Sequence, residues 1–444
     1  MKITFLGATQ EVTGSKYLVQ HEKIQMLVDC GMYQGSHDTK KRNWYRFPVE
    51  PHSIQAIVLT HAHLDHTGYI PRLVKEGFKG AIYCSQATYD LCAIVLKDSA
   101  SIQEEDFKSG LLRQEPLYSQ QDVYNSLALF HIVPYEKSFN VGGLTITLIS
   151  SEHIVGSSFV QISDGVKMLT FSGDLSGPRQ LLMKAPPHID STDYLVLEST
   201  YGDRLTEPGD PMEMVADIVN TTIARKGVLI IPAFAIGRTQ TMLYILYQLK
   251  KQNKIPNIPI FLDSPEAISV TSLLCNFLGE LKISEKECQD VLNVATYVRT
   301  GEQSKNIDHR SGSVIIIAGS GMAEGGRVLH HFARFISDAK NTVLFVGFQA
   351  PDTRGKALID GAEGMKIDGV WYNVHAAIKN MDLLSAHADY NDILQWLTGF
   401  QKAPQKVFLT HGDLPAAQFL KKKIEEKFGW PVVIPKHLES FDLE

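Results

Sequence analysis

Short apolar runs, separated by polar stretches and small residues, divide this chain into predicted strands and helices. Up to about residue 205 most of these runs are short and rich in β-branched residues, a pattern typical of buried strands. We predict strands at Ile3–Leu6, Tyr17–Val19, Ile24–Val28, Ile57–Leu59, Leu144–Ile149, Phe159–Ile162, Met168–Phe171 and Tyr194–Leu197, and helices at Tyr69–Lys75 and across much of Ala87–Leu129. This part of the chain is therefore predicted to be mainly β-structure.

From about residue 205 the pattern changes to strand–helix alternation, which implies a parallel sheet with helices on both faces. The predicted elements are strands at Val228–Ile231, Ile258–Leu262, Val314–Ile317 and Val343–Val346, and helices at Gln240–Leu249, near Ile268–Leu278 and from Arg327. After about residue 380 the chain returns to strand–loop–helix units that carry histidines. Because no Pro-rich linker or repeat separates these parts, we expect residues 205–379 to be a domain inserted into one formed by residues 1–204 and 380–444.

Composition adds limits to this picture. The 444 residues are 44% hydrophobic and 21% charged, as in an ordinary globular protein with two or three domains. No apolar run is long enough to span a membrane, and the start of the chain resembles a strand more than a signal peptide. The five cysteines are odd in number, scattered and free of CxxC spacing. They predict a reducing compartment, with the cytoplasm as the expected location, and no disulfide frame.

The net charge of −6 argues against a protein that coats itself in nucleic acid, but it leaves room for a local basic groove. In Lys40–Arg46 basic residues are interleaved with Trp44 and Tyr45, as in surfaces on which bases stack. A solvated loop with a buried tryptophan is an equally good interpretation. The three lysines Lys421–Lys423 are interpreted as the solvated face of a helix.

The segment Thr60–Gly68 carries the strongest chemical signal. Three imidazoles and a carboxylate occupy six positions directly after a buried strand: His61, His63, Asp65 and His66. Zn²⁺ prefers such ligands after thiolate, and no cysteine is nearby in the sequence. Four ligands are too many for one catalytic ion that keeps a position open for water, so two ions are the simpler interpretation.

Further candidate ligands follow other predicted strands. His153, Asp174 and His411 each stand just after an apolar strand and close to small residues that let the backbone turn. Alone, each would more often be a capping or turn residue. Together they supply the bridging carboxylate and the additional histidines that a two-metal site needs.

These motifs resemble those of a known family. The run from His61 to His66 matches the HxHxDH signature of the metallo-β-lactamase superfamily, and His153 and Asp174 stand where that superfamily has its next ligands. Glu198–Gly202, Ser385–Tyr390 and Leu409–Asp413 resemble motifs A, B and C of the β-CASP ribonucleases, the family of the pre-mRNA cleavage endonuclease subunit. The segments Pro232–Gln240, Asp263–Pro265, Gly319–Met322 and Gly325–Arg327 are also similar to family segments. The resemblance covers essentially the whole chain, and it is to the compact prokaryotic type.

The resemblance implies an α/β fold, a metallo-β-lactamase αββα sandwich with an inserted β-CASP domain. It implies two Zn²⁺ ions, with Mn²⁺ as an alternative, bound by these residues: His61, His63 and His153 on one ion, Asp65, His66 and His411 on the other, and Asp174 bridging. The pair would activate a hydroxide for attack on phosphorus. Asp65 would orient the hydroxide, His387 would protonate the leaving oxygen, and Glu198 would orient His387.

The inserted domain is expected to supply the substrate wall. Backbone amides at the starts of its helices can hold phosphates, and arginine binds phosphate oxygens bidentately. The candidates are Arg238, Ser320, Gly321 and Arg327, although structural salt bridges explain such arginines as often. Glu152 departs from the family pattern, which has glycine before the metal-binding histidine. His330 and His331, adjacent on a helix, are interpreted as packing or substrate-edge residues.

Three functions are compatible with the sequence. The first is a zinc-dependent ribonuclease of single-stranded RNA, an endonuclease with 5′ exonuclease action as a second mode. The second is a hydrolase of a small ester, thioester or lactam, which the inserted domain and His387 disfavour. The third is an inactive RNA-binding relative, which the intact ligand set disfavours. No membrane partner is expected, a homodimer is left open, and the RNA target cannot be inferred.

Overall fold

The architecture is that of a computed structural model in which residues 1–110, 114–347, 349–350 and 352–444 are described. Residues 111–113, within the segment predicted to be largely helical, lie outside them. The chain divides into two compact units, unit 1 with residues 1–205 and 387–444 and unit 2 with residues 206–386. No helix among the described residues is long and apolar enough to cross a bilayer.

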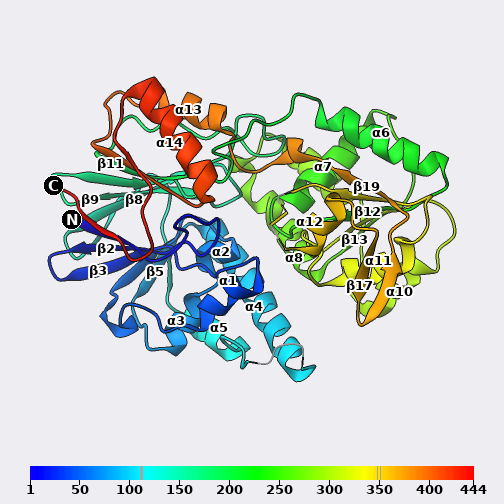
Figure 1. Ribbon diagram of the computed structural model, residues 1–444, viewed down its shortest axis with the longest axis horizontal. Coiled ribbons are helices and arrows are strands. Elements are labelled where there is room, and N and C mark those ends of the chain that lie inside the picture. The colour runs from blue at the N-terminus through cyan, green and yellow to red at the C-terminus, as the bar shows by residue number, and fades with distance from the viewer. Residues whose placement is uncertain (111–113, 348, 351) are drawn as a thin grey trace. The chain divides into compact units, whose positions relative to one another are not determined.

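Unit 1 contains two seven-stranded mixed sheets (Figure 1). In hydrogen-bonded order the first is β22 (Ser440–Asp442), β1 (Lys2–Phe5), β2 (Tyr17–His21), β3 (Ile24–Val28), β4 (Ala56–Val58), β5 (Ala81–Cys84) and β6 (Phe130–Ile132). The second is β21 (Val432–Val433), β20 (Lys406–Thr410), β11 (Tyr194–Glu198), β10 (Met168–Phe171), β9 (Ser158–Ser163), β8 (Leu144–Ser150) and β7 (Phe139–Val141). The strands predicted in this part of the chain are confirmed.

A hydrophobic core lies between these two sheets because side chains alternate along their strands. It contains Val19, Val28 and Val58 from the first sheet and Val160 and Phe408 from the second. The outer face of the second sheet packs against α13 (Tyr390–Leu397) and α14 (Leu414–Phe428) through a separate apolar cluster. The other helices of unit 1 are α1 (His37–Lys41), α2 (Leu64–Thr67), α3 (Ile70–Lys75), α4 (Gln86–Lys108) and α5 (Gln120–Leu127), with short 3₁₀ turns at Arg42–Trp44 and Pro51–Ser53.

Unit 2 has an all-parallel, six-stranded sheet, as the strand–helix alternation predicts. Its order is β14 (Thr296–Tyr297), β13 (Ile260–Asp263), β15 (Ile315–Ala318), β12 (Leu229–Pro232), β16 (Thr342–Phe345) and β19 (Ala377–Asn380). The helices are α6 (Pro211–Ala224), α7 (Arg238–Lys251), α8 (Pro265–Leu273), α9 (Glu285–Leu292), α10 (Gly301–Asp308), α11 (Arg327–Phe335) and α12 (Arg354–Ile359), with 3₁₀ turns at Leu274–Glu280 and Asp382–Leu384 and a hairpin of β17 (Gly364–Ile367) and β18 (Val370–Asn373). The fold is therefore the predicted sandwich with an inserted α/β domain.

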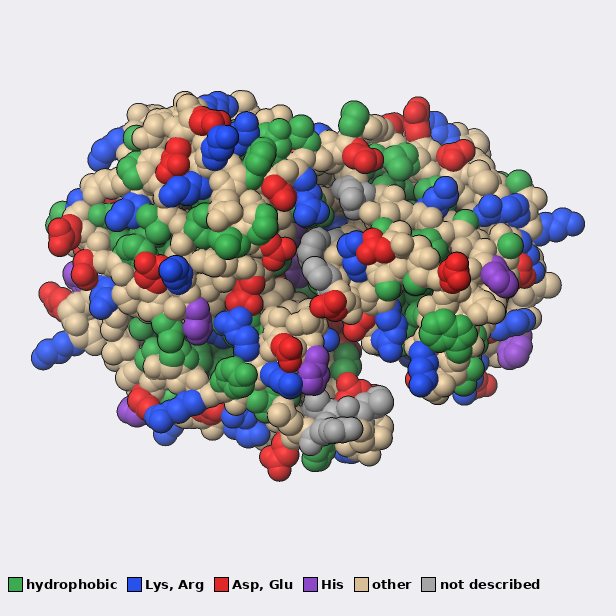
Figure 2. Space-filling view, viewed as in Figure 1, with side chains coloured by type: hydrophobic (Ala, Val, Ile, Leu, Met, Phe, Trp, Pro, Cys, Tyr) green, Lys and Arg blue, Asp and Glu red, His purple; other side chains and the backbone are tan. Residues whose placement is uncertain are grey.

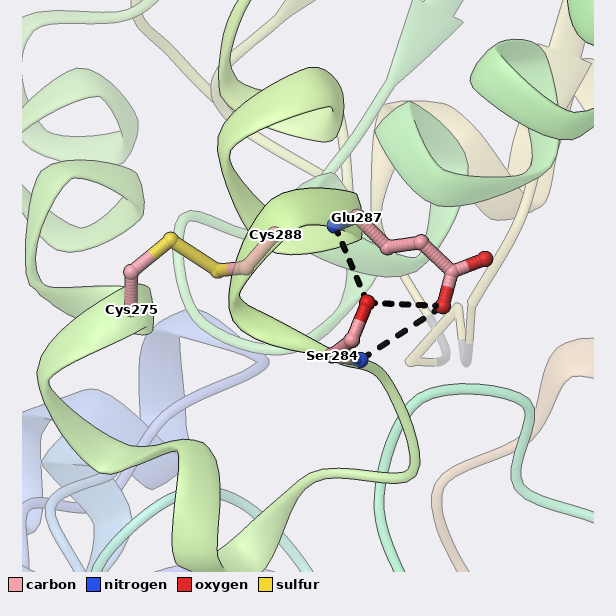
Figure 3. The surroundings of a disulfide bond; sticks show 4 residues. All are labelled: Cys275, Ser284, Glu287 and Cys288. Atoms are coloured by element: carbon pink, nitrogen blue, oxygen red, sulfur yellow. Dashed lines mark hydrogen bonds between the residues drawn. A yellow bond between two sulfur atoms is a disulfide. The ribbon is translucent and has the colours of Figure 1, made fainter.

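The expectation that the cysteines form no disulfide frame is wrong for one pair. Cys275 and Cys288 form a disulfide with Cα atoms 5.8 Å apart, whereas Cys30, Cys84 and Cys92 are free and buried. An odd count requires only that one cysteine stay unpaired. Figure 3 shows why this pair meets: Ser284 begins α9 with a capping box to Glu287, and the first turn of that helix carries Cys288 to Cys275.

Reduction of this disulfide is expected to lower the free energy of unfolding by about 2–3 kcal/mol, because opening a short loop increases the entropy of the unfolded chain. Denaturant unfolding with and without a thiol reductant measures the difference. The Cys275→Ser/Cys288→Ser variant should unfold like the reduced wild type and be insensitive to reductant. Equal stability of the oxidised and reduced wild type would contradict the expectation.

Candidate metal centre

The HxHxDH loop of unit 1 begins where the buried strand β4 ends. The backbone N–H and the hydroxyl of Thr60 donate to the two carboxylate oxygens of Asp29, each at 2.8 Å. Gly31 passes so close to the loop that a Cβ there would lie 1.6 Å from the carbonyl oxygen of Asp65. Only glycine allows this approach, and it positions α2, which carries Asp65 and His66.

Four side chains from three separate segments converge to form a first ligand group. One ligand atom from each of His61, His63, His153 and Asp174 lies within 4.8 Å of the others. Nε2 of His61 is 3.0 Å from Nδ1 of His63 and 3.4 Å from Oδ2 of Asp174. Nε2 of His153 is buried and has no hydrogen-bond partner among the described residues. A buried ring nitrogen left in this way, aimed at a carboxylate and two imidazoles, fits a metal ion.

Asp65, His66 and His411 form a second group with the same spacing of ligand atoms. Nε2 of His411 lies 3.1 Å from Nε2 of His66 and 3.3 Å from Oδ2 of Asp65. Asp174 lies between the two groups, with Oδ1 3.2 Å from Nε2 of His66 and Oδ2 3.5 Å from Nε2 of His153. All seven residues that the sequence suggested as ligands are thus brought together, and they are called the metal cluster below.

The pairing of strands explains this convergence. β11 and β20 are parallel neighbours with Glu198 opposite Thr410, so His411 follows at the same edge as Glu198. β10 pairs in parallel with β11, which brings Asp174 to that edge as well. The ends of parallel strands meet at one side of a sheet, and residues far apart in sequence therefore become neighbours there.

The residues that orient the imidazoles were not predicted from the sequence. A metal ligand is aimed by the partner of its other ring nitrogen. These Nδ1 partners are the Thr60 hydroxyl for His61 at 3.1 Å, the Asp29 carboxylate for His66 at 2.7 Å, the Ser176 hydroxyl for His153 at 3.2 Å and the Thr200 hydroxyl for His411 at 2.9 Å. Asp29 had a visible signal, since it too is a polar residue directly after a predicted strand.

Burial makes His61 and His63 good ligands. Burial, reinforced by neighbouring imidazoles, lowers the pKa of His61 to about 3 and that of His63 to about 4, so both rings are neutral at pH 7. Burial would raise the pKa of Asp174, but His411, His66 and a hydrogen bond from His61 hold it well below its usual value. Neutral imidazole and ionised carboxylate are the forms that bind metal.

His387 and Glu198 lie beside the metal cluster. Nδ1 of His387 is 3.0 and 3.2 Å from the two carboxylate oxygens of Glu198 and 4.0 Å from Oδ2 of Asp174. Glu198 is buried and also accepts bonds from the backbone N–H groups of Leu175 and Thr200. An ionised carboxylate can only accept, so Nδ1 of His387 carries a proton and donates it to Glu198.

The backbone that follows His387 is held by two contacts. The N–H of Ala388 donates to the carbonyl of Leu175 at 2.7 Å, and Leu175 is the residue directly after Asp174. Asp389 begins α13 by accepting from the N–H of Asp392, and it also accepts from Arg179 at 2.7 Å. His387 is thus placed by the first turn of a helix and by a salt bridge, not by its own contacts alone.

The four predicted substrate residues belong to unit 2. Arg238 is buried in the first turn of α7, and the Ser320 hydroxyl accepts from the N–H groups of Glu324 and Gly325. Gly321 packs against Phe234, where a Cβ would lie 2.8 Å from the ring. The metal cluster belongs to unit 1, so substrate binding by these four residues stays a prediction.

Arg327 binds this chain's own acceptors: Asp263 at 2.5 Å and the carbonyl of Val298 at 2.9 Å through Nη1, and the carbonyl of Arg299 at 3.0 Å through Nη2. His331 is fully buried between Asp263 at 2.8 Å and Asp308 at 2.9 Å. The Arg327–Asp263 pair is the structural salt bridge given above as the alternative to phosphate binding. His331 is a packing residue that shares Asp263 with it. The network ties α11 to β13 and α10.

Glu152, the residue that departs from the family pattern, has a φ of +58°. That is the left-handed region in which glycine is favoured, which gives a physical reason for glycine at this place in relatives. The side chain is buried, its Oε2 has no hydrogen-bond partner among the described residues, and burial raises its pKa.

Family models match most of the chain. The metallo-beta-lactamase superfamily matches residues 11–211, the Beta-Casp domain matches residues 239–358, and the Zn-dependent metallo-hydrolase RNA specificity domain matches residues 371–435. Ribonuclease TTHA0252 of Thermus thermophilus is 33% identical over 420 residues, which cover 93% of each chain. Transcription termination factor FttA of Methanosarcina mazei is 29% identical over 453 residues, covering 96% of this chain and 69% of that one.

A solved structure of a protein of unknown function from Enterococcus faecalis superposes with a TM-score of 0.55. It covers 100% of this chain and 99% of that one at 14% identity, a likeness that shows the fold alone. The fold and the matched domains define a metal-dependent hydrolase of the metallo-β-lactamase superfamily. More narrowly, the chain belongs to the β-CASP ribonucleases, and it acts on RNA.

Proposed function

We propose that this enzyme hydrolyses phosphodiester bonds of single-stranded RNA with two zinc ions held in the metal cluster, cutting as an endonuclease. The observation that carries the proposal is the position of Asp174 between two groups of three ligands each. Nitrogen and oxygen ligands without thiolate suit zinc in a catalytic site. When bound, two such ions acidify a water molecule and offset charge on the phosphoryl oxygens.

The chain's own residues supply the remaining steps. Asp65 has Oδ2 at 3.3 Å from Nε2 of His411 and can accept a hydrogen bond from the attacking water, which orients it. As a general acid, His387 must carry a proton on each ring nitrogen: the Nδ1 proton is held by Glu198, and the Nε2 proton passes to the leaving oxygen. A general acid at that position removes the need to expel an alkoxide.

Two features support RNA as the substrate over a small ester or lactam. The RNA specificity domain matched at residues 371–435 covers both His387 and His411. Ribonuclease TTHA0252, whose name states the activity, resembles the chain over 93% of its length. Removal of nucleotides from a 5′ end is a second mode of cutting that the same experiment detects.

Cleavage of a 5′-labelled single-stranded RNA by zinc-loaded protein tests the proposal. We expect internal fragments, and we expect Asp65→Ala to lose them, with metal content measured on both proteins. Labelled mononucleotides alone would indicate 5′ exonuclease action instead. No cleavage by protein with two bound metals would overturn the proposal and make the small-molecule hydrolase the function to test.

A further inference from the structure

The segment Lys40–Arg46 of unit 1 turns its cations and one aromatic ring toward solvent. Tyr45 is 64% exposed, the Arg46 side chain is 85% exposed, and Lys40 and Lys41 are exposed as well. Residues 36–50 contain four Lys or Arg and two Asp or Glu, a local charge of +2 in a chain of net charge −6. On the face drawn in Figure 2 basic and acidic side chains are interspersed.

The inner side of this segment is firmly attached. Asn43 is buried, and its side chain both accepts from the backbone N–H of Tyr33 and donates to the carbonyl of Tyr33, each at 2.8 Å. Both carboxylate oxygens of Glu11 accept from Arg42, at 2.5 and 2.7 Å. The Arg42 guanidinium also lies 4.0 Å from the centre of the Tyr33 ring. A ligand that meets this surface need not order it first.

Residues that precede this segment or hold it are hydrogen-bonded to the loops of the metal cluster. The N–H of Cys30 donates to the carbonyl of His66 at 2.7 Å, and the N–H of Met32 donates to the carbonyl of Leu64 at 2.8 Å. The carbonyl of Glu11, whose side chain holds Arg42, accepts from the N–H of Gly412 at 3.1 Å. The segment is therefore attached, within unit 1, to the two loops that carry His66 and His411.

The outward cations are free to exchange partners. Lys41 contacts Asp38 at 3.3 Å and Arg46 contacts Glu50, and all four side chains are largely exposed. Exposed pairs of this kind contribute little to stability. Lys40 has no acidic partner within the described part of the chain. Phosphate groups can replace these carboxylates without leaving a buried charge unpaired.

The interpretation as a solvated loop with a buried tryptophan accounts for only part of the segment. Trp44 is partly buried and its indole N–H donates to the carbonyl of Glu115 at 3.0 Å. The ring of Tyr45, the next residue, has no hydrogen bond or ring contact among the described residues, and it is 64% exposed. Lysine is depleted at protein–protein interfaces. Cations interleaved with aromatic rings are typical of surfaces that bind single-stranded nucleic acid.

On the basis of the proposed function, we propose that Lys40–Arg46 is a binding surface for single-stranded RNA. The Tyr45 ring stacks on one base, and Lys40, Lys41 and Arg46 neutralise the neighbouring phosphates. The surface holds the strand that enters the metal cluster, and it recognises single-strandedness because a base must be unpaired to stack on the ring. It reads no base edge, so binding is insensitive to sequence.

Fluorescence anisotropy with a 5′-labelled oligouridylate tests this surface on metal-loaded protein. A His387→Ala background slows cleavage, and gels verify that the RNA stays intact. Tyr45→Ala is expected to bind about tenfold more weakly, and Tyr45→Phe, which keeps the ring, is expected to bind like the parent. Lys40→Gln/Lys41→Gln should reduce the slope of log K against log salt by about 1.4, the value for two phosphate contacts on a single strand.

The matched control is Lys422→Gln/Lys423→Gln on α14, whose lysines pair with Glu426. This variant also removes two positive charges, so an effect of net charge alone on RNA binding would appear in both double variants. In the otherwise wild-type enzyme, Tyr45→Ala should raise KM and leave kcat unchanged. Unchanged affinity of Tyr45→Ala, or equal slopes in the two lysine variants, would overturn the proposal. Absence of RNA binding by the parent protein would instead remove the proposed function itself.

Discussion

Substitution of asparagine for Asp174 is expected to remove bound metal and to lower the rate of RNA cleavage by about three orders of magnitude, or about 4 kcal/mol of transition-state stabilisation. Among the described residues, Asp174 is the carboxylate that lies close to both ligand groups: Oδ2 is 3.4 Å from Nε2 of His61, and Oδ1 is 3.5 Å from Nε2 of His411. Asparagine keeps the shape and one acceptor oxygen but removes the negative charge that two cations share.

Metal analysis together with cleavage assays measures this effect. Asp217→Asn, at an exposed position of α6, makes the same change of charge and shape and should retain metal and activity. Thermal unfolding of the metal-free proteins shows whether Asp174→Asn still folds. A folded Asp174→Asn protein that binds two metals and cuts at the wild-type rate would show that this carboxylate does not join the two groups.

The metal ligands could be predicted from the sequence because they lie just after predicted strands. Asp174 and His411 each follow a short, mostly apolar strand of the second sheet, and the ends of these strands meet at one edge. Asp65 lies in the loop that follows the buried strand β4 of the first sheet. The pattern therefore locates both the strand and its functional end. Strands with mixed burial were harder to recognise: β6 and β18 are short and largely exposed, and neither forms an apolar run.

Residues that act through tertiary contacts could not be found in this way. Thr200 is an ordinary threonine in sequence, and only the pairing of β11 with β20 brings its hydroxyl to Nδ1 of His411. Arg327 shows the reverse problem. Its place after two glycines suggests phosphate binding, yet its guanidinium donates to the carboxylate of Asp263, 64 positions earlier in the chain. Pairing over such distances leaves no local signal.

The geometry also separates metal binding from proton transfer. The seven cluster residues have ligand atoms directed at one another, whereas Nδ1 of His387 lies at the edge of the cluster, 3.0 Å from Glu198 and 4.0 Å from Oδ2 of Asp174. Burial keeps Glu198 from water, and two backbone N–H groups hold its carboxylate in place. Loss of His387 should therefore affect a different step from loss of Asp174, and the two can be distinguished by experiment.

His387→Ala is expected to lower kcat by a factor of about 10² to 10³ while metal content and KM stay close to those of the wild type. The reason is that an alkoxide leaving group must then depart without a proton donor. Glu198→Gln, which keeps a hydrogen-bonding side chain but presents either an amide N–H or a neutral oxygen to Nδ1, should lose less, about tenfold, because the imidazole is still present but less firmly oriented.

An RNA with sulfur in place of the leaving oxygen at the cut site separates this role from a structural one. A thiolate departs without protonation, so His387→Ala should cleave this substrate almost as fast as the wild type does. Asp174→Asn should remain slow on both substrates, because its defect precedes departure of the leaving group. If His387→Ala is equally slow on oxygen and sulfur substrates, His387 does not act as the acid, and its contact with Glu198 serves only to hold the edge of the metal cluster in shape.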